Sequence, residues 1–468
     1  MNGASVTFEP ASPRDVFRYV SNAHELLSHG SVGLRRDALD IMEHALDAAR
    51  PYGLCLQCLD LRGSKLYVNG QLIWDLAADA SVWFFGAGKA SLDLARGAEE
   101  VFGERLRGGL VICKQGEEGS LRRILLRHAS HPIPDESSLR ATDELIALLS
   151  APRPGDLVVF GITGGSSALM VKPCHGLTLA DLQDLARVLL TCGADITQIN
   201  AVRKHVSDVG GGKLLRHLDP EVFVLNLTIS DVVGDAFDHI TDPTVPDRST
   251  IADARATLDR FDLWERVKPN VRSYLSEGGQ VAETPKAIER PQRLDVLLAP
   301  SSIACDAACS RALALGYASI VLSTSFQGES TSLGSHLGAI ADEIAKRSQP
   351  LKPPAALLSG GETVVVVGSC KGTGGPNQEF VLATILASST KRPMVVLGID
   401  TDGTDGPTDI AGALCDGETL RRAEALAVDI PKALRDHDVT PTLLKLGDAV
   451  ITGSTGTNVN DLRLLLVG

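Results

Sequence analysis

Short apolar runs that end in polar, glycine-containing turns recur along this chain, and they restrict its fold more than any other feature. One run, residues 82–85, leads into Gly86-Ala87-Gly88-Lys89 and then into a helical pattern over residues 90–102. Another, residues 156–162, leads into the glycine and hydroxyl turn of residues 163–167. Similar runs lie at residues 319–323, 355–358 and 394–398. Regular alternation of strand, turn and helix predicts an α/β protein whose sheets are parallel at least in part.

The length of 468 residues exceeds what one hydrophobic core usually organises, so the sequence predicts two domains. The polar segment 277–291, which contains two glycines and two prolines, is the candidate linker. We therefore expect domains over residues 1–284 and 285–468, both of the α/β class. An apolar fraction of 44% is sufficient for two cores.

The net charge of −13 argues against a nucleic-acid surface or an anionic membrane as partner. The sequence has no N-terminal signal pattern and no apolar run near the ~18 residues of a membrane span, so we expect a cytoplasmic protein. Nine scattered cysteines indicate reduced thiols. The pair Cys55-x-x-Cys58 is compatible with half of a zinc or redox site, but buried free thiols are the favoured interpretation.

The segment 195–247 gathers charged, hydroxyl and glycine residues around one apolar run, residues 222–229. Cations precede that predicted strand and carboxylates follow it, and chemistry in α/β proteins gathers at strand ends. Phosphoryl transfer needs this combination, because cations cradle phosphate oxygens while carboxylates hold Mg²⁺ or accept a hydroxyl proton. The candidate residues are Asn200, Arg203, Lys204, His205, Ser207, Gly210, Gly211, Gly212, Lys213, Ser230, Asp231, Gly234, Asp235, Thr244 and Asp247.

Two glycine turns outside this segment are candidate anion sites. In the turn of residues 86–89, backbone amides at a helix start face an anion and Lys89 adds a positive charge. The turn is no dinucleotide fingerprint, because Ser91 occupies the third small position, and it lacks the Walker A spacing. A tight turn with a solvated lysine is equally compatible. Residues 163–167 offer amides and hydroxyls, although serines there are also typical helix caps, and His131 is a further candidate contact.

Seven sequence motifs occur in order: GAGKA at 86–90, HPIPD at 131–135, GGSSAL at 164–169, NAVRKHVS at 200–207, SDVVGD at 230–235, TDGTDGPT at 401–408 and TGTNVND at 455–461. Together they resemble the motifs of class II glycerate 2-kinases. The C-terminal part of this family is the MOFRL domain, here about residues 355–461, and some members are labelled hydroxypyruvate reductases. The resemblance extends from about residue 14 to the end of the chain.

The resemblance implies a Rossmann-like first domain with a largely parallel sheet, a smaller mixed α/β second domain, and an active site in the cleft between them. It implies that Mg-ATP phosphorylates D-glycerate to 2-phosphoglycerate, with a homodimer as the assembly to consider. By the same resemblance, Lys89, Arg203 and Asp231 are catalytic, and Asp231 and Asp235 hold Mg²⁺. The residues implied to bind substrate or nucleotide are Gly86, Gly88, Gly164, Gly165, Ser166, Ser167, Asn200, Lys204, Ser207, Lys213, Asn377, Glu379, Asp402 and Asp405.

The sequence departs from the family pattern at three positions. Gly210 and Pro376 stand where the family has lysine and arginine, and Asp242 stands where it has glycine. Two cations are therefore absent and one anion is added. Three functions stay open: an ATP-dependent hydroxy-acid kinase, a kinase-like protein with another substrate or no activity, and an NAD(P)H-dependent hydroxypyruvate reductase.

Overall fold

The computed structural model describes residues 17–229, 243–277, 283–368 and 370–468. The chain forms two compact units, each discontinuous in sequence. We call Ala49–Ser301 with Gly456–Val459 the parallel unit, and Met1–Ala48 with Ser302–Thr455 and Asn460–Gly468 the mixed unit. Within the described ranges, no helix is long and apolar enough to cross a membrane.

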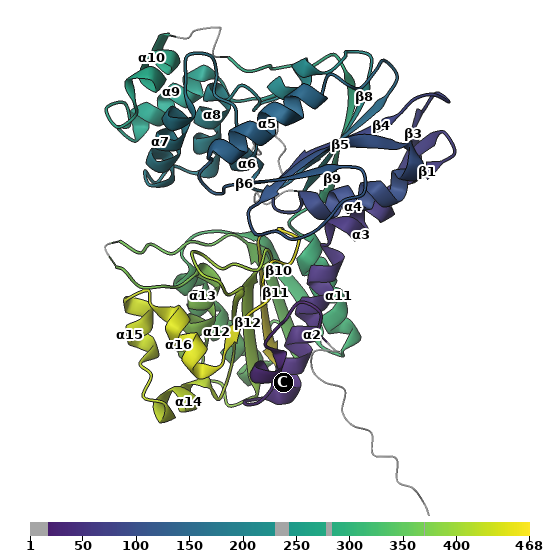
Figure 1. The fold of residues 1–468 in the computed structure, drawn as a ribbon. Helices are drawn as coiled ribbons and strands as arrows, with labels where there is room; N and C mark the ends of the chain where they lie inside the picture. Colours follow the sequence, from purple (N-terminus) through teal and green to yellow (C-terminus); the bar gives the residue numbers. More distant parts are fainter. Residues whose placement is uncertain (1–16, 230–242, 278–282, 369) are drawn as a thin grey trace, which may run out of the picture. The chain divides into compact units, whose positions relative to one another are not determined.

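Six parallel strands form the sheet of the parallel unit, in the order β6-β5-β4-β7-β8-β9 (Figure 1). The chain first adds strands on one side of β4 and later adds β7, β8 and β9 on the other side. The strand order thus reverses between β4 and β7, and open α/β sheets bind ligands at the carboxyl ends of strands at such a switch point. The strands are β4 (Val82–Ala87), β5 (Leu106–Lys114), β6 (Leu125–Ala129), β7 (Leu157–Ile162), β8 (Phe223–Ile229) and β9 (Gln292–Ala299). The predicted parallel α/β sheet is confirmed.

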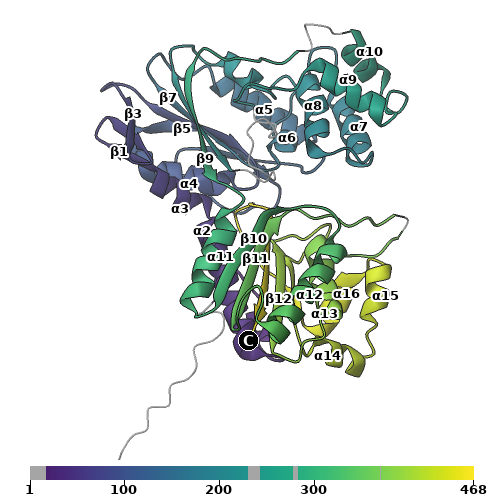
Figure 2. The same ribbon diagram turned by 180° about the vertical axis from the view of Figure 1, so that it is seen from behind.

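Helices cover both faces of this sheet. Helices α3 and α4 lie on one face and α5 on the other (Figure 2). Inward side chains such as Phe85 and Phe160 share a core with Leu145 of α5. Strand β9 lies beyond residue 285, where the second domain was expected to begin, but it pairs with β8 and belongs to the parallel unit. The elements are α3 (Pro51–Cys58), α4 (Ser91–Phe102), α5 (Glu136–Leu148), α6 (Ser166–Leu169) and the 3-10 helices η2 (Gly103–Arg105) and η3 (Lys213–His217).

Four further helices of the parallel unit form a second core beside the sheet. Leucines of α7, such as Leu182 and Leu185, pack with Val202 of α8 and Leu258 of α9 in this core. Two of these helices, α9 and α10, follow each other along the chain after β8. The bounds are α7 (Leu179–Leu190), α8 (Ile196–Val206), α9 (Ile251–Arg260) and α10 (Pro269–Glu277). A small antiparallel sheet that the sequence analysis did not anticipate consists of β1 (Leu59–Arg62), β2 (Lys65–Val68) and β3 (Gln71–Asp75).

The mixed unit contains a sheet in the order β10-β11-β15-β12-β13-β14. Strands β10 and β11 pair in parallel and the other pairs are antiparallel, as predicted for a mixed second sheet. Helices α2 and α11 cover one face, and α12 and α13 the other (Figures 1 and 2). The strands are β10 (Ala318–Phe326), β11 (Ala355–Gly361), β12 (Met394–Asp400), β13 (Gly412–Asp416), β14 (Ala449–Val450) and β15 (Asp461–Val467). The helices are α1 (Ala23–Leu26), α2 (Val32–Ala48), α11 (Ile303–Ala314), α12 (Ser330–Arg347), α13 (Pro376–Ala387), α14 (Thr419–Ala425), α15 (Ile430–Arg435) and α16 (Val439–Leu446).

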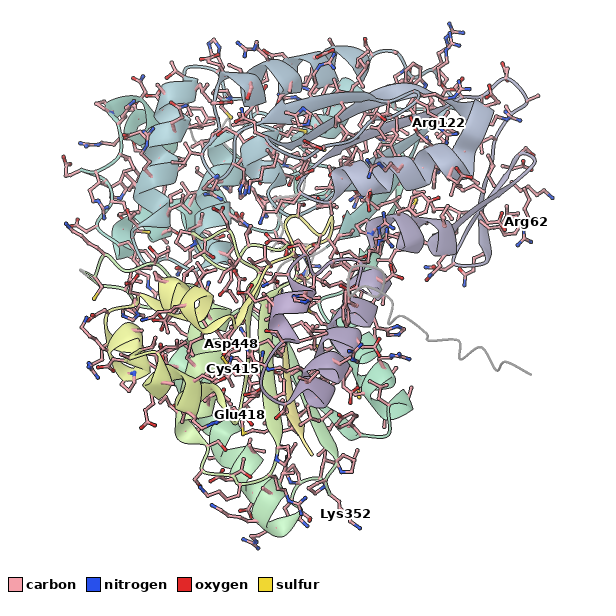
Figure 3. The ribbon with its side chains drawn as sticks, turned by 60° about the horizontal axis from the view of Figure 1, so that its bottom comes forward. Arg62, Arg122, Lys352, Cys415, Glu418 and Asp448 are labelled. Carbon is pink, nitrogen blue, oxygen red and sulfur yellow. The ribbon has the colours of Figure 1, made fainter. Side chains whose placement is uncertain are left out.

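A buried ion network explains why α2 belongs to the mixed unit. The fully buried Arg35 of α2 donates to Asp416 over 2.6 Å and to Asp448 over 2.7 Å (Asp448 is labelled in Figure 3). Asp448 also accepts hydrogen bonds from Arg422 and contacts His29. Burial raises the pKa of Asp448, but the hydrogen bond with His29 and the charges of Arg35 and Arg422 outweigh it and hold the pKa at about 2. Such a network stabilises the fold only while every charge is paired.

We predict that Asp448→Asn lowers the free energy of unfolding by about 3 kcal/mol, because Arg35 then keeps a buried charge with one counter-ion fewer. The folded-state pKa of Asp448 is below its unfolded value, so its contribution is present above about pH 4 and is lost as the pH falls towards 2. Urea unfolding at neutral and acid pH measures both effects. Glu418→Gln, on a half-exposed carboxylate of the same region, is the control and should change little. Equal stability of the two variants would contradict the prediction.

Candidate functional site

The turns that follow β4 and β7 are hydrogen-bonded to each other. Lys89 N donates to Gly164 O over 2.9 Å, and Thr163 N donates to Ala87 O over 3.0 Å. Thr163 Oγ1 accepts from Ala90 N over 3.1 Å. Because β4 and β7 are parallel neighbours, their carboxyl ends reach the same sheet edge, and both predicted anion turns meet there.

Two glycines make this approach feasible. Gly88 has φ +131°, and a Cβ there would lie only 2.0 Å from Thr163 Oγ1. Gly165 has φ +84°, and a Cβ there would lie 3.0 Å from His131 Cδ2 and 3.6 Å from Lys89 Cγ. The side chains of His131 and Lys89 therefore flank the same glycine, so the turn, the lysine and the histidine singled out in the sequence are brought together.

A pocket in the parallel unit continues from these turns, and we call it the Arg203 pocket. Its polar lining comes from Ser166 and Ser167, which follow Gly165, and from Arg203 and Ser207 at the end of α8. The described residues that line it are Pro132, Pro134, Ser166, Ser167, Ala168, Met170, Val171, Leu182, Leu185, Ala186, Arg203, Val206, Ser207, Val209, Gly210 and Pro243. The pocket thus joins four predicted binding residues to an apolar wall.

Arg203 is the cation that this pocket presents. No hydrogen bond or ion pair joins its side chain to another residue in the described ranges, and burial alone lowers the pKa of its guanidinium. Its helix α8 is held in place because Cys174 N donates to Val206 O over 3.0 Å and Asp208 N donates to Lys172 O over 2.7 Å. A desolvated cation without an anion is costly, so the pocket favours an anionic ligand.

Lys204, the next residue, is directed into the protein instead. Its side chain is 3% exposed and its Nζ lies 3.0 Å from Asp247 Oδ1. Asp247 also accepts from Thr284 Oγ1 over 2.8 Å and from Ser249. Burial raises the pKa of Asp247, but the Lys204 charge and these hydrogen bonds lower it below its usual value. The Lys204 charge is thereby neutralised inside the unit, and Asn200, one turn earlier on α8, is also buried.

Lys213 stabilises the end of α8. Its Nζ donates to Lys204 O over 3.0 Å and to Ser207 O over 2.5 Å, which are carbonyls of the last helical turn and the residue after it. A cation at a helix C-terminus satisfies free carbonyls and interacts favourably with the helix dipole. Burial lowers the pKa of Lys213, and Lys213 does not line the Arg203 pocket.

Several predicted residues of the central segment, among them Ser230 and Gly234, lie outside the residues that the structure describes. Asp231, Asp235 and the departure at Asp242 lie outside the described residues, and the described strand β8 ends at Ile229. In the ranges that the structure covers, no three His, Cys, Asp or Glu side chains gather as a metal site. The predicted Mg²⁺ ligands therefore stay a prediction. Cys55 and Cys58 are buried thiols, and burial raises the pKa of Cys55 to about 12.

The remaining predicted residues lie in the mixed unit, around the start of α13. Asp405 accepts from Asn377 N over 3.1 Å and from Gln378 N over 3.0 Å, so it caps the helix that Pro376 begins. Burial raises the pKa of Asp405 to about 7. Glu379 lies 2.9 Å from His437. These contacts support the helix from within the unit, and the ligand roles of these side chains stay predictions.

Asp402 lies in the turn after β12. Its carboxylate accepts from Thr404 N and Thr404 Oγ1, both over 2.8 Å, which is a common way for aspartate to close a turn. It is partly exposed, unlike Asp405. Its predicted binding role is likewise untested by these contacts.

Glu117 is a titratable residue near Lys89 that the sequence motifs do not include. Glu117 follows β5, the neighbour of β4, and burial raises the pKa of its carboxyl to about 7, while the charges of Lys114 and Lys89 act in the opposite direction. A carboxyl group that titrates near neutral pH beside a candidate active-site lysine is itself a functional candidate. The sequence signal for Glu117 was its position directly after a predicted strand. Several neighbouring residues are also charged, so the sequence does not distinguish Glu117 from them.

We predict that Lys213→Met lowers the free energy of unfolding by about 2 kcal/mol, because two carbonyls at the end of α8 lose their donor. Lys172→Met is the control, since Lys172 forms a partly exposed ion pair with Asp143 and should contribute less than about 1 kcal/mol. Thermal and urea unfolding of both variants measure the difference. If the two substitutions cost the same, Lys213 does not cap α8.

Comparison with known proteins covers both units. Residues 37–276 match a domain of unknown function, DUF4147, and residues 355–461 match the MOFRL family. The chain is 38% identical to glycerate 2-kinase of Pyrococcus horikoshii, over 93% of this chain and 98% of that protein. It is 37% identical to D-glycerate 2-kinase of Thermotoga maritima, over 81% and 89%. A relative from Agrobacterium vitis with the provisional name hydroxypyruvate reductase is 38% identical, over 82% and 86%.

A solved structure supports the same relationship. The crystal structure of a glycerate kinase from Thermotoga maritima has a TM-score of 0.79 to this chain at 33% identity, and the match covers 93% of this chain and 100% of that one. Together the two family matches cover parts of both the parallel and the mixed unit. The matches to the Pyrococcus horikoshii protein and to the Thermotoga maritima crystal structure each cover 93% of this chain. The chain belongs to the glycerate kinase family with DUF4147 and MOFRL domains.

Proposed function

We propose that this protein transfers the γ-phosphoryl group of ATP to the 2-hydroxyl of D-glycerate or a related 2-hydroxy acid. The observation that carries the proposal is Arg203, a guanidinium without an ionic partner in the described part of the chain, in a pocket next to two glycine turns. The relatives named glycerate 2-kinase support a kinase that uses ATP. The parallel sheet supports a ligand at this edge, because β4 and β7 flank the switch point.

In this proposal, Arg203 binds the substrate carboxylate through its planar donor fork. Lys89, held beside Gly165, stabilises negative charge on the transferring phosphoryl group, and the amides and hydroxyls of residues 163–167 bind phosphate or substrate oxygens. The 2-hydroxyl oxygen forms a bond to the γ-phosphorus, the bond to the ADP oxygen breaks, and the hydroxyl proton passes to a base. Catalysis then rests on positioning and electrostatics.

Carboxylates complete the proposed site. We assign Asp231 and Asp235 to Mg²⁺ or to the attacking hydroxyl, on the strength of the resemblance alone. Arg203 and Ser207 are assigned to substrate, whereas the buried contacts of Lys204 and Lys213 favour structural roles for those two lysines. Asn377 and Asp405 are proposed to act by fixing the start of α13.

The proposal is tested by incubating the purified protein with ATP, Mg²⁺ and D-glycerate. We expect release of ADP together with formation of a phosphate ester on C2. A coupled enzyme assay measures the ADP, and ³¹P NMR identifies the ester. If the protein oxidises NADPH in the presence of hydroxypyruvate and releases no ADP with any 2-hydroxy acid, the reductase function is favoured over the kinase. No turnover in either assay would favour a protein without this activity.

We predict that Arg203→Gln lowers kcat/KM for the hydroxy acid by about 10²-fold or more, because the carboxylate loses a bidentate, charged donor. Arg187→Gln, on the exposed face of the neighbouring helix α7, is the matched control and should retain activity. Thermal unfolding of both variants checks that the fold is intact. Full activity of a folded Arg203→Gln protein would remove Arg203 from the substrate site.

A further inference from the structure

Within the described part of the chain, the Arg203 pocket has one charged side chain and a mainly apolar lining. Among the described residues that line it, Arg203 alone carries a charge, and its other polar groups are the serines near the glycine turn and Ser207. Most of the remaining wall is aliphatic and comes from three segments: Met170 and Val171 after α6, Leu182, Leu185 and Ala186 on α7, and Val206 on α8. A ligand that fits this lining has one anionic group and one apolar group.

The apolar wall is part of a well-packed core. Leu182, Leu185 and Val206 belong to the cluster that holds α7 and α8 together, and each is at most 7% exposed. The wall is therefore fixed in position by the packing of the helices. A preformed apolar wall binds an apolar group without a large cost of ordering the protein.

The position of phosphorylation decides which part of the substrate faces this wall. In a 2-hydroxy acid, C2 carries the carboxylate, the reacting hydroxyl, a hydrogen and one further substituent. If Arg203 binds the carboxylate and the hydroxyl is directed to the phosphoryl donor, the further substituent is free to enter the apolar part of the pocket. In glycerate that substituent is hydroxymethyl, whose hydroxyl loses water there and needs a new hydrogen-bond partner.

We infer that the Arg203 pocket selects 2-hydroxy acids with a short apolar substituent on C2 over glycerate, an inference that rests on the proposed function. D-glycerate and D-2-hydroxybutanoate form a matched pair of ligands for comparison. They differ only in that the hydroxyl on C3 of D-glycerate is replaced by a methyl group in D-2-hydroxybutanoate. Buried in an apolar wall, the methyl is favoured because it forfeits no hydrogen bond with water. A branched substituent that fills more of the wall binds more tightly still.

The first experiment measures binding without nucleotide, so that it does not depend on phosphoryl transfer. Isothermal titration calorimetry with D-glycerate, D-2-hydroxybutanoate and D-2-hydroxy-3-methylbutanoate gives three dissociation constants. We expect D-2-hydroxybutanoate to bind about tenfold more tightly than D-glycerate, and the branched acid about fourfold more tightly again. Equal or tighter binding of D-glycerate, or binding of none of the acids, overturns the inference.

The second experiment places the apolar substituent in the pocket. Ala186→Leu adds side-chain volume to the wall on α7, and it should reduce the preference for the branched acid over D-glycerate by about tenfold. Ala256→Leu makes the same change at an exposed position of α9 that lies outside the Arg203 pocket, and it should leave this ratio unchanged. An unaltered ratio in a folded Ala186→Leu protein overturns the assignment of the substituent to this wall.

Repeating the series with ATP separates the two ideas. ADP release that follows the same order as the affinities supports both the substrate class and the kinase. Tighter binding of the apolar acids without ADP release supports the inferred selectivity of the pocket and contradicts the proposed kinase function. Turnover of D-glycerate that exceeds turnover of both apolar acids retains the kinase and removes the inference.

Discussion

The hydrogen bonds between the turns after β4 and β7 are the constraint on which the site geometry depends. They form because the two strands are parallel neighbours in register, so that Ala87 pairs with Ile162 and both chains leave the sheet at the same level. The approach is too close for side chains, and Gly88 and Gly165 supply both the space and the positive φ. One consequence is that Lys89 and His131 converge on Gly165. Another is that Ser166 and Ser167 enter the wall of the Arg203 pocket.

Three cations lie close together in sequence near the end of α8, and the helix gives each a different environment. Successive helical residues point about 100° apart, so Arg203 lines the pocket while Lys204 is buried against Asp247. Lys213 returns to the free carbonyls after the helix has ended. The pocket therefore presents one guanidinium, although the sequence offers three cations. This single charge, among the described lining residues, is the basis of the inferred preference for a monocarboxylate with an apolar substituent over a polyanion.

The mixed unit is organised by buried polar groups. Arg35 joins α2 to Asp416 and Asp448, and Asp405 joins the turn after β12 to the first turn of α13. Buried charges are costly unless they are paired and hydrogen-bonded, so these contacts define where each element packs. The acidic loop after β12 thus has a structural function within its unit. The start of α13 tolerates Pro376, because the first residue of a helix needs no N–H donor there.

The sequence alone was sufficient for the fold class and for the glycine turns of the candidate site. Apolar runs followed by glycine turns are local signals, so strands β4, β7 and β8, and the turns with Gly86, Lys89 and Gly164, could be predicted from residue order. The motifs were specific enough to identify the family, which the similarity to known glycerate kinases confirms. The caps of α7 and α8, at Thr178 and Asp195, are local features of the same kind, because each side chain bonds an amide three residues further on.

Only the tertiary structure decided which functional groups meet. Strand β9 was expected to belong to the second domain, but it pairs with β8 and completes the first sheet. A short apolar run predicts a strand but does not indicate which strand will be its neighbour. Lys204 and Lys213 were predicted to bind substrate or nucleotide. In the folded chain, Lys204 pairs with Asp247 and Lys213 donates to carbonyls at the end of α8, and these partners could not be predicted from residue order. The apolar wall beside Arg203 was likewise invisible in the sequence, because its residues come from separate segments and have the periodicity of ordinary core positions. A sequence records which side chains are available, whereas the balance of burial, charge pairing and strand order determines which of them a ligand can reach.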